Sequence, residues 1–212
     1  MRNSILSVSL ALVIVTLASC KDNVPQATQT GNPVVESIMA RRSVRHYTDE
    51  KVPRELLQKI AECGINAPNA MNAQEWEVRI VDDDSFLVGA TEVLKETIPA
   101  LVGENDPKFR NGFRNATALI AVACPEDESG MSLINVGLLC ENICLAAQSY
   151  GLGSVIMGGP VGVMNTHPGL KPYLDRLAFS EGYKLRILIG LGYPDESPAA
   201  RPRDVQKIKF AD

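Results

Sequence analysis

The stretch "SLINVGLLCENICLAAQSYGLGSVIMGG", Ser132 to Gly159, is the part of the sequence that decides the fold. Its first part is apolar almost all round and predicts a long, central buried helix that is closed by Gly151. The strand "SVIMGG" follows and ends in two glycines. One face of a sheet cannot cover a helix that is apolar on every side, and the remainder would be costly to expose. We therefore expect a second subunit to cover it, in a homodimer.

Three further strands are predicted outside this stretch. Residues 116–124 ("ATALIAVAC") have the near-continuous apolar run of a strand that is buried on both faces. Residues 183–194 ("YKLRILIGLGYP") and 77–83 ("EVRIVDD") also have strand patterns. Helices are predicted to begin near Pro33, Pro53 and Ser85. The fold class is therefore α+β, or an α/β sandwich, with a small central sheet flanked by helices.

The N-terminus differs from the rest of the chain. Arg2 precedes an apolar run that is shorter than the roughly twenty residues of a membrane-spanning helix, as in a secretory signal. The ending "LASC" resembles the lipobox of bacterial lipoproteins, in which the signal is cleaved before a cysteine that is then acylated. We expect a signal peptide at 1–19, a lipidated flexible tether at 20–31 with the lipid on Cys20, and the folded domain at 32–212. The alternatives are an ordinary secretory signal and a misread start codon. The lipoprotein interpretation places the protein in the cell envelope, anchored to a bacterial membrane by its lipid alone.

Composition excludes several classes of protein. The 212 residues carry a net charge of −4, 45% are hydrophobic and 22% are charged, which is typical of a globular domain. The sequence has no basic stripe to bind a nucleic acid backbone, so no nucleic acid partner is expected. No Cys/His spacing suggests a metal site, and Cys140 and Cys144 fall on the apolar helix as buried hydrophobes.

The segment "RRSVRHYTDEKVP", Arg41 to Pro53, concentrates positive charge in an acidic chain. Arginines at the C-terminus of a helix are favourable for structural reasons alone, which can account for Arg41 and Arg42. It accounts for neither Arg45 nor the intervening Ser43. Arginine binds phosphate in bidentate fashion, so the cluster also fits a small, local anion.

Four segments in this order resemble the nitroreductase family of flavin mononucleotide (FMN) enzymes. They are "RRSVRHY", "APNAMNAQEW", "GLLCENICLAAQSYGLGSVIMGG" and "GLGYPDESPAARPR", and the resemblance runs from about Val34 to Arg203. It implies the α+β fold of that family, an intertwined homodimer and two FMN sites at the dimer interface.

The resemblance also implies a set of FMN-binding residues. Arg41 and Arg42 would meet the phosphate and ribityl end, Ser43 the ring edge, and Arg45 the pyrimidine edge. The remaining positions are the loop residues Pro68, Asn69, Ala70, Asn72 and Gln74, partly from the partner subunit, then Gly158 and Gly159 against the ring, and Arg201 and Arg203 on the phosphate. These residue types suit a dianion and a flat ring, because glycine allows close approach and amides match a mixed edge. Gly158 and Gly159 could equally form a strand-ending turn, and Arg201 and Arg203 could be solvated tail charges.

The function implied is an FMN-dependent oxidoreductase that moves hydride from NAD(P)H via the flavin to nitroaromatics, quinones or similar acceptors. No catalytic side chain is expected, because the hydride would pass directly to and from flavin N5. Two alternatives remain. One is a flavin enzyme of the same fold with another native reaction, and the other is a non-enzymatic FMN-binding or electron-relay lipoprotein.

Overall fold

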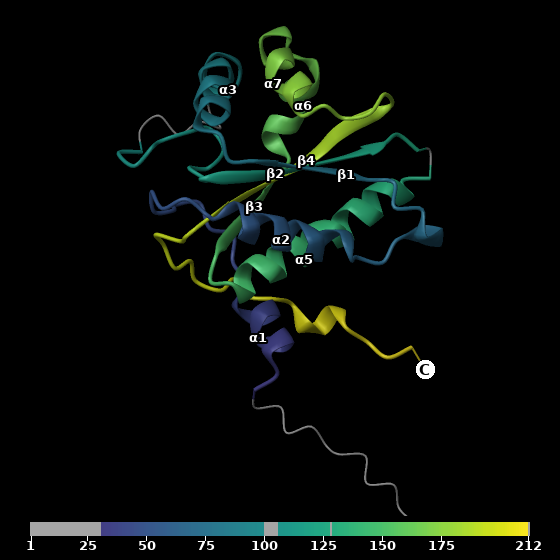
Figure 1. Cartoon of the computed structure of the whole chain (residues 1–212). Helices are drawn as coiled ribbons and strands as arrows, with labels where there is room; N and C mark the ends of the chain where they lie inside the picture. Colours follow the sequence, from purple (N-terminus) through teal and green to yellow (C-terminus); the bar gives the residue numbers. More distant parts are fainter. Residues whose placement is uncertain (1–30, 100–105, 128, 212) are drawn as a thin grey trace, which may run out of the picture. The chain divides into compact units, whose positions relative to one another are not determined.

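A four-stranded antiparallel sheet forms the centre of the domain (Figure 1). The strands are β1 (Glu77–Val81), β2 (Ala118–Pro125), β3 (Gly153–Met157) and β4 (Tyr183–Gly192), in the order β1-β2-β4-β3. The computed structural model describes residues 31–99, 106–127 and 129–211, and the chain from Pro33 onward forms one compact unit. The expected signal peptide, Cys20 and the tether up to residue 30 lie outside the described residues.

The central strand β2 is buried on both faces, as its apolar run predicts. Ile120 faces Ile80 of β1 on one side and Ile189 of β4 on the other. Because successive strand residues point to opposite faces, Leu119 and Ile120 belong to different cores. One core therefore lies above the sheet and another below it.

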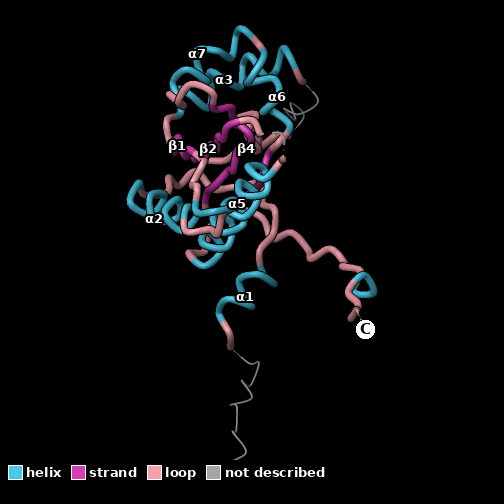
Figure 2. The backbone as a smooth tube through the Cα atoms, turned by 90° about the vertical axis from the view of Figure 1, so that its right-hand side faces the viewer, coloured by secondary structure: helices cyan, strands magenta, loops and turns pink. Residues whose placement is uncertain are grey.

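Helices cover both faces of the sheet. On one face lie α3 (Asp84–Thr97), α6 (Gly159–Thr166) and α7 (Lys171–Arg176), and on the other lie α2 (Arg54–Ile65) and α5 (Met131–Ser149). Figure 2, turned by 90°, shows the same three-layer arrangement around β1, β2 and β4. The predicted fold class is thus confirmed, although α6 and α7 were not predicted.

The apolar helix α5 is buried along one face only. Leu139, Ile143 and Ala147 are fully buried between the sheet and α2. The opposite side exposes apolar side chains, namely Met131, Leu133, Ile134 and Leu138. This agrees with the expectation that one face of the sheet cannot cover the whole helix, and the covering of the exposed side by a second subunit stays a prediction. By length and composition α5 could also cross a membrane, as the core helices of many globular domains could.

Two further segments expose apolar residues. The first is α1 (Pro33–Ala40), which contacts α5 and has no buried residue. The second is the C-terminal stretch around the short 3₁₀ helix η3 (Val205–Lys207), where Phe210 is 97% exposed. Two other 3₁₀ turns, η1 (Ala70–Asn72) and η2 (Pro168–Leu170), complete the described elements. Together with the open side of α5, these segments give the single chain a large uncovered apolar surface.

Candidate active site

The segment that follows α1 is held between β3 and the continuation of β4. The Val44 amide donates to the Ser154 carbonyl at 3.0 Å, and Ser43 forms a parallel bridge with Ser154. On the other side, the Thr48 amide donates to the Tyr193 carbonyl at 2.9 Å. These backbone bonds bring the chain from both ends of the domain to one place.

A groove of about 370 Å³ opens where these two parts of the chain meet. We call it the arginine groove. Its walls come from the end of α1, the segment after it and the stretch beyond β4: Ile38, Met39, Arg41, Arg42, Ser43, Arg45, Pro198, Ala199, Ala200, Arg201 and Arg203. Six of the residues predicted to bind FMN line it, although their sequence positions differ by about 160 residues. Five of those six are arginines, and among the residues that the structure describes no carboxylate lines the groove.

The five arginines differ in how they are engaged. Arg42 Nη1 donates to the carbonyl of Met39 at 2.7 Å and to that of Arg41 at 2.8 Å, so part of its role is to cap the end of α1. Arg41 Nε lies 3.9 Å from Glu141 Oε1, a long and partly exposed ion pair. Arg201 has no side-chain hydrogen bond or ion pair with any described residue. Most of the positive charge is therefore free to meet a ligand.

Arg45 and Arg203 donate only to nearby backbone. Arg45 Nη1 bonds the Ser43 carbonyl at 3.1 Å, and Arg203 Nη1 bonds the Arg201 carbonyl at 3.2 Å. Neither guanidinium meets a carboxylate among the described residues. The helix-dipole explanation of the cluster holds for Arg42, and the anion explanation fits the others.

Three buried side chains of the domain, Tyr47, Cys140 and Cys144, keep their protons at neutral pH. Burial raises the pKa of the Tyr47 hydroxyl, which donates to the Val44 carbonyl at 2.6 Å. Burial likewise raises the pKa of the Cys144 thiol, and raises that of Cys140 to about 12. None of these three side chains is set up for catalysis, so the groove is better suited to binding than to side-chain chemistry.

Gly158 and Gly159 lie at the end of β3 and the start of α6, and both are exposed. A Cβ at Gly158 would meet only Ile187 Cδ1, at 3.8 Å, which is an ordinary contact. Its φ of −91° is open to any residue. The chain does turn here at the end of β3, where the Val161 amide donates to the Gly158 carbonyl at 3.1 Å, but neither packing nor the φ angle requires glycine at position 158. A bare backbone at this edge fits close approach by a flat ligand.

The loop that contains Pro68, Asn69, Ala70, Asn72 and Gln74 does not line the arginine groove of its own chain. Asn69 Oδ1 accepts from the Gln74 amide at 2.9 Å, and Asn135 of α5 accepts from the Ala70 amide at 3.2 Å.

This loop is also locally strained. Met71, Asn72 and Gln74 have φ between 52° and 54°, in the left-handed region that non-glycine residues rarely occupy. Met71 is 99% exposed, and no described group pairs with the side chain of Asn72 or Gln74. The loop thus presents unused polar groups outward, and its contact with FMN stays a prediction.

Three contributors to this region were not predicted. Glu196 Oε1 accepts from the backbone amide of Arg45, and Glu141 approaches Arg41. Arg110 donates to the carbonyls of Tyr47 and Thr48 and thereby fixes the end of the Arg41–Asp49 segment. Their partners are distant in sequence or are backbone groups, so no local sequence signal could have identified them.

Comparisons with known proteins identify the family and agree with the fold. The chain matches the model of the nitroreductase family over residues 38–193. It is similar to the crystal structure of a nitroreductase with bound FMN from Desulfitobacterium hafniense, with a TM-score of 0.74 and 29% identity, covering 86% of this chain and 100% of that chain.

Two sequence relatives cover similar parts of the chain. A Methanothermobacter thermautotrophicus protein, provisionally named an NADH dehydrogenase/NAD(P)H nitroreductase, is 30% identical over 79% of this chain and 81% of its own length. The FMN reductase (NAD(P)H) of Bacillus subtilis is 29% identical over 81% of this chain and 70% of its own length. Because the family model spans most of the domain and the layered fold matches a solved member, the chain belongs to the nitroreductase family.

Proposed function

We propose that the protein is an FMN-dependent oxidoreductase of nitroreductase type, with the FMN phosphate bound in the arginine groove. The observation that carries the proposal is the meeting of Arg41, Arg42 and Arg45 with Arg201 and Arg203 in one groove, which no carboxylate from the described part of the chain lines. A phosphate monoester carries a charge of about −1.5 to −2 at neutral pH, so it needs several cations in an open site. FMN-bound nitroreductases with this fold support the identity of the ligand.

The chain's residues suit the rest of the cofactor as well. Ser43 offers a hydroxyl within the groove, and β3 leads from its bridge with Ser43 to the bare backbone at Gly158. Four residues of extended strand span about 13 Å, which is the distance that an elongated ligand would bridge between the Ser43 end and Gly158. When bound, FMN would take up hydride from NAD(P)H and deliver it to a nitroaromatic, a quinone or a similar acceptor. The protein's part is then to hold and orient the cofactor, which agrees with the raised pKa values of Tyr47, Cys140 and Cys144.

A homodimer is part of the proposal. The open face of α5, the exposed side of α1 and the C-terminal residues Val205, Ile208 and Phe210 form more apolar surface than a monomer normally leaves uncovered. A second copy would cover it by symmetry, with the same patch on both subunits. The outward-facing loop with Asn72 and Gln74 would then complete the partner's FMN site.

We also propose that Cys20 is lipidated and that the domain is tethered to a bacterial membrane. The support is the sequence "LASC" and the polar stretch between it and α1. Substitution Cys20→Ala should move the protein from the membrane fraction to the soluble fraction. Retention of the variant in the membrane fraction would remove the lipid anchor from the account and leave the flavin site intact.

Another native reaction on the same fold is a second candidate. A Thermotoga neapolitana protein named iodotyrosine deiodinase is 26% identical over 80% of this chain and 93% of its own length. The site would then bind the same FMN but accept a halogenated aromatic substrate. Turnover of such a substrate faster than any nitroaromatic or quinone would favour this candidate.

One experiment tests the proposed function. Purified protein should be yellow, should be bleached by one equivalent of NADH or NADPH per flavin without oxygen, and should regain colour when a nitroaromatic or quinone is added. A yellow protein that neither NADH nor NADPH bleaches would instead indicate flavin binding without this enzymatic activity.

A further inference from the structure

The C-terminal arm, residues 197–211, carries two of the five groove arginines but is almost unattached. Among the described residues, no hydrogen bond or ion pair joins the arm to the rest of the chain. Its own bonds are internal, such as Arg203 to the Arg201 carbonyl and the Gln206 amide to Asp204. The residue just before the arm therefore makes the final attachment.

That residue is Glu196, and its carboxylate accepts from the backbone amide of Arg45. Glu196 forms no ion pair with a described arginine, although five guanidinium groups line the neighbouring groove. A carboxylate placed to neutralise the groove would pair with a guanidinium. The Glu196 carboxylate instead accepts from a main-chain amide, so the arginine side chains stay available to bind an anion.

The preceding residue, Asp195, makes two further attachments. The Asp195 carboxylate bonds Lys108 Nζ at 2.6 Å in a second hollow that also contains His46 and Arg110. The Asp195 amide donates to the His46 carbonyl at 2.9 Å. Asp195 and Glu196 therefore attach the chain to this segment at two neighbouring points, the His46 carbonyl and the Arg45 amide, just before the arm begins.

We propose that Glu196 is a positioning residue for the anion site. It holds the Arg45 backbone and the start of the arm together, so that Arg201 and Arg203 face Arg41 and Arg42 before any ligand binds. A site assembled in advance loses less conformational freedom when the ligand arrives. This inference rests on the proposed function, because the anion is taken to be the FMN phosphate.

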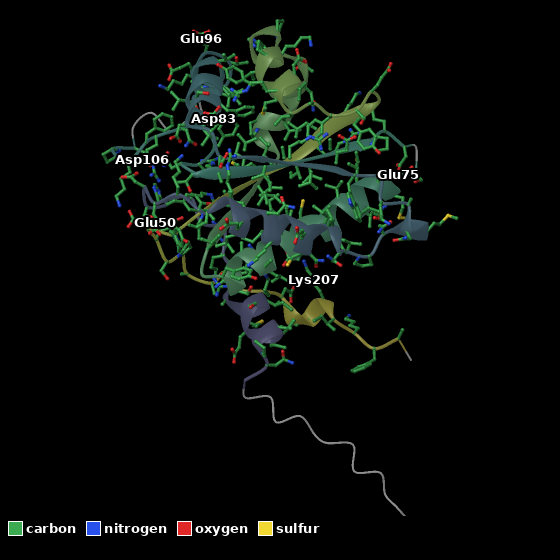
Figure 3. The ribbon with its side chains drawn as sticks, in the orientation of Figure 1. Glu50, Glu75, Asp83, Glu96, Asp106 and Lys207 are labelled. Carbon is green, nitrogen blue, oxygen red and sulfur yellow. The ribbon has the colours of Figure 1, made fainter. Side chains whose placement is uncertain are left out.

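The test compares FMN with riboflavin, which lacks the phosphate. The full-length protein, Glu196→Ala, Glu196→Gln and the control Glu50→Ala are each titrated with both flavins, and the ratio of the riboflavin Kd to the FMN Kd is measured. Glu50, labelled in Figure 3, is exposed and its carboxylate has no partner among the described residues. The control therefore removes a negative charge without removing an attachment.

Glu196→Ala should lower this ratio about tenfold, the scale of losing one hydrogen bond to a charged group. Glu196→Gln retains an acceptor for the Arg45 amide and should keep the ratio within about threefold of the unmodified protein. Glu50→Ala should not change it. General destabilisation of the fold would weaken the binding of both flavins alike and would leave the ratio of the two Kd values unchanged.

A second measurement needs no flavin. Hydrogen exchange of the Arg45 amide in the cofactor-free protein should be faster in Glu196→Ala and restored in Glu196→Gln. An unchanged ratio in Glu196→Ala, or a Glu196→Gln variant as impaired as the alanine variant, would overturn the positioning role. If the unmodified protein binds neither flavin, it is the proposed function that fails.

Discussion

Substitution Gly153→Ala tests whether the arginine segment depends on its close contact with β3. A Cβ at Gly153 would lie 2.8 Å from Val44 Cβ and Cγ1 and 3.0 Å from Val44 Cγ2. Non-bonded carbon atoms normally stay about 3.5–4.0 Å apart. Val44 is buried between Ser43 and Arg45, so the segment cannot move aside without disturbing the groove.

We expect Gly153→Ala to lower the free energy of unfolding by about 1–3 kcal/mol, the usual cost of overpacking. With an m-value of about 2 kcal/mol/M, a loss of 2 kcal/mol would lower the urea midpoint by about 1 M. FMN affinity should fall in the same variant. Gly162→Ala in α6 is the matched control, because no atom lies within 4 Å of its added Cβ and alanine favours the helix.

A double variant separates this contact from other causes. Val44→Ala removes two of the three atoms that a new Cβ would meet. Gly153→Ala combined with Val44→Ala should therefore be less destabilised than the sum of the two single variants. If Gly153→Ala unfolds at the same urea concentration as the unmodified protein, the docking of this segment on β3 is wrong.

Three other predictions address the groove, the dimer and acid stability. Arg201→Ala should weaken FMN binding about tenfold, which is the low end of the effect of losing a charged partner because the groove is open. Arg201→Lys keeps the charge and should lose less affinity. Isothermal titration calorimetry measures both, and an unchanged FMN affinity in Arg201→Ala would count against the site. Ile134→Glu on the exposed face of α5 should yield monomers in sedimentation velocity without unfolding, and a stable dimer would exclude this face as the interface. Hydrogen bonding from Ser85, aided by Arg176, lowers the pKa of Asp83 from 3.8 to about 2. Because the folded value is the lower one, the stability that Asp83 contributes is present above pH 4 and lost as the pH falls through 2, so Asp83→Asn should flatten the dependence of unfolding on pH in that window.

Hydrophobic pattern was sufficient to predict the sheet. Strands β2 and β3 lie close to their expected positions, because a strand that is buried on both faces consists almost entirely of apolar residues. The short helices α6 and α7 escaped prediction, since eight and six residues carry too little periodicity to be recognised. The exposed side of α5 was expected, because the helix is apolar over more of its surface than one face of a sheet can cover.

Part of the candidate site could be predicted from the sequence and part could not. Arg41, Arg42 and Arg45 stand out in sequence because they are adjacent and sit in an acidic chain. Their meeting with Arg201 and Arg203 depends on backbone bonds between distant segments, and it could be inferred only from the resemblance to a family. Glu196 could not be identified at all, because its partner is a main-chain amide, which any residue except proline would supply at position 45.

The preference for a phosphorylated flavin tests the central claim most directly. Cofactor-free protein should be titrated with FMN and with riboflavin at physiological ionic strength. The account predicts one FMN per chain, bound at least tenfold more tightly than riboflavin, with a preference that shrinks as salt is added. Equal affinity for the two flavins, or no uptake of FMN in excess, would contradict the assignment of the arginine groove.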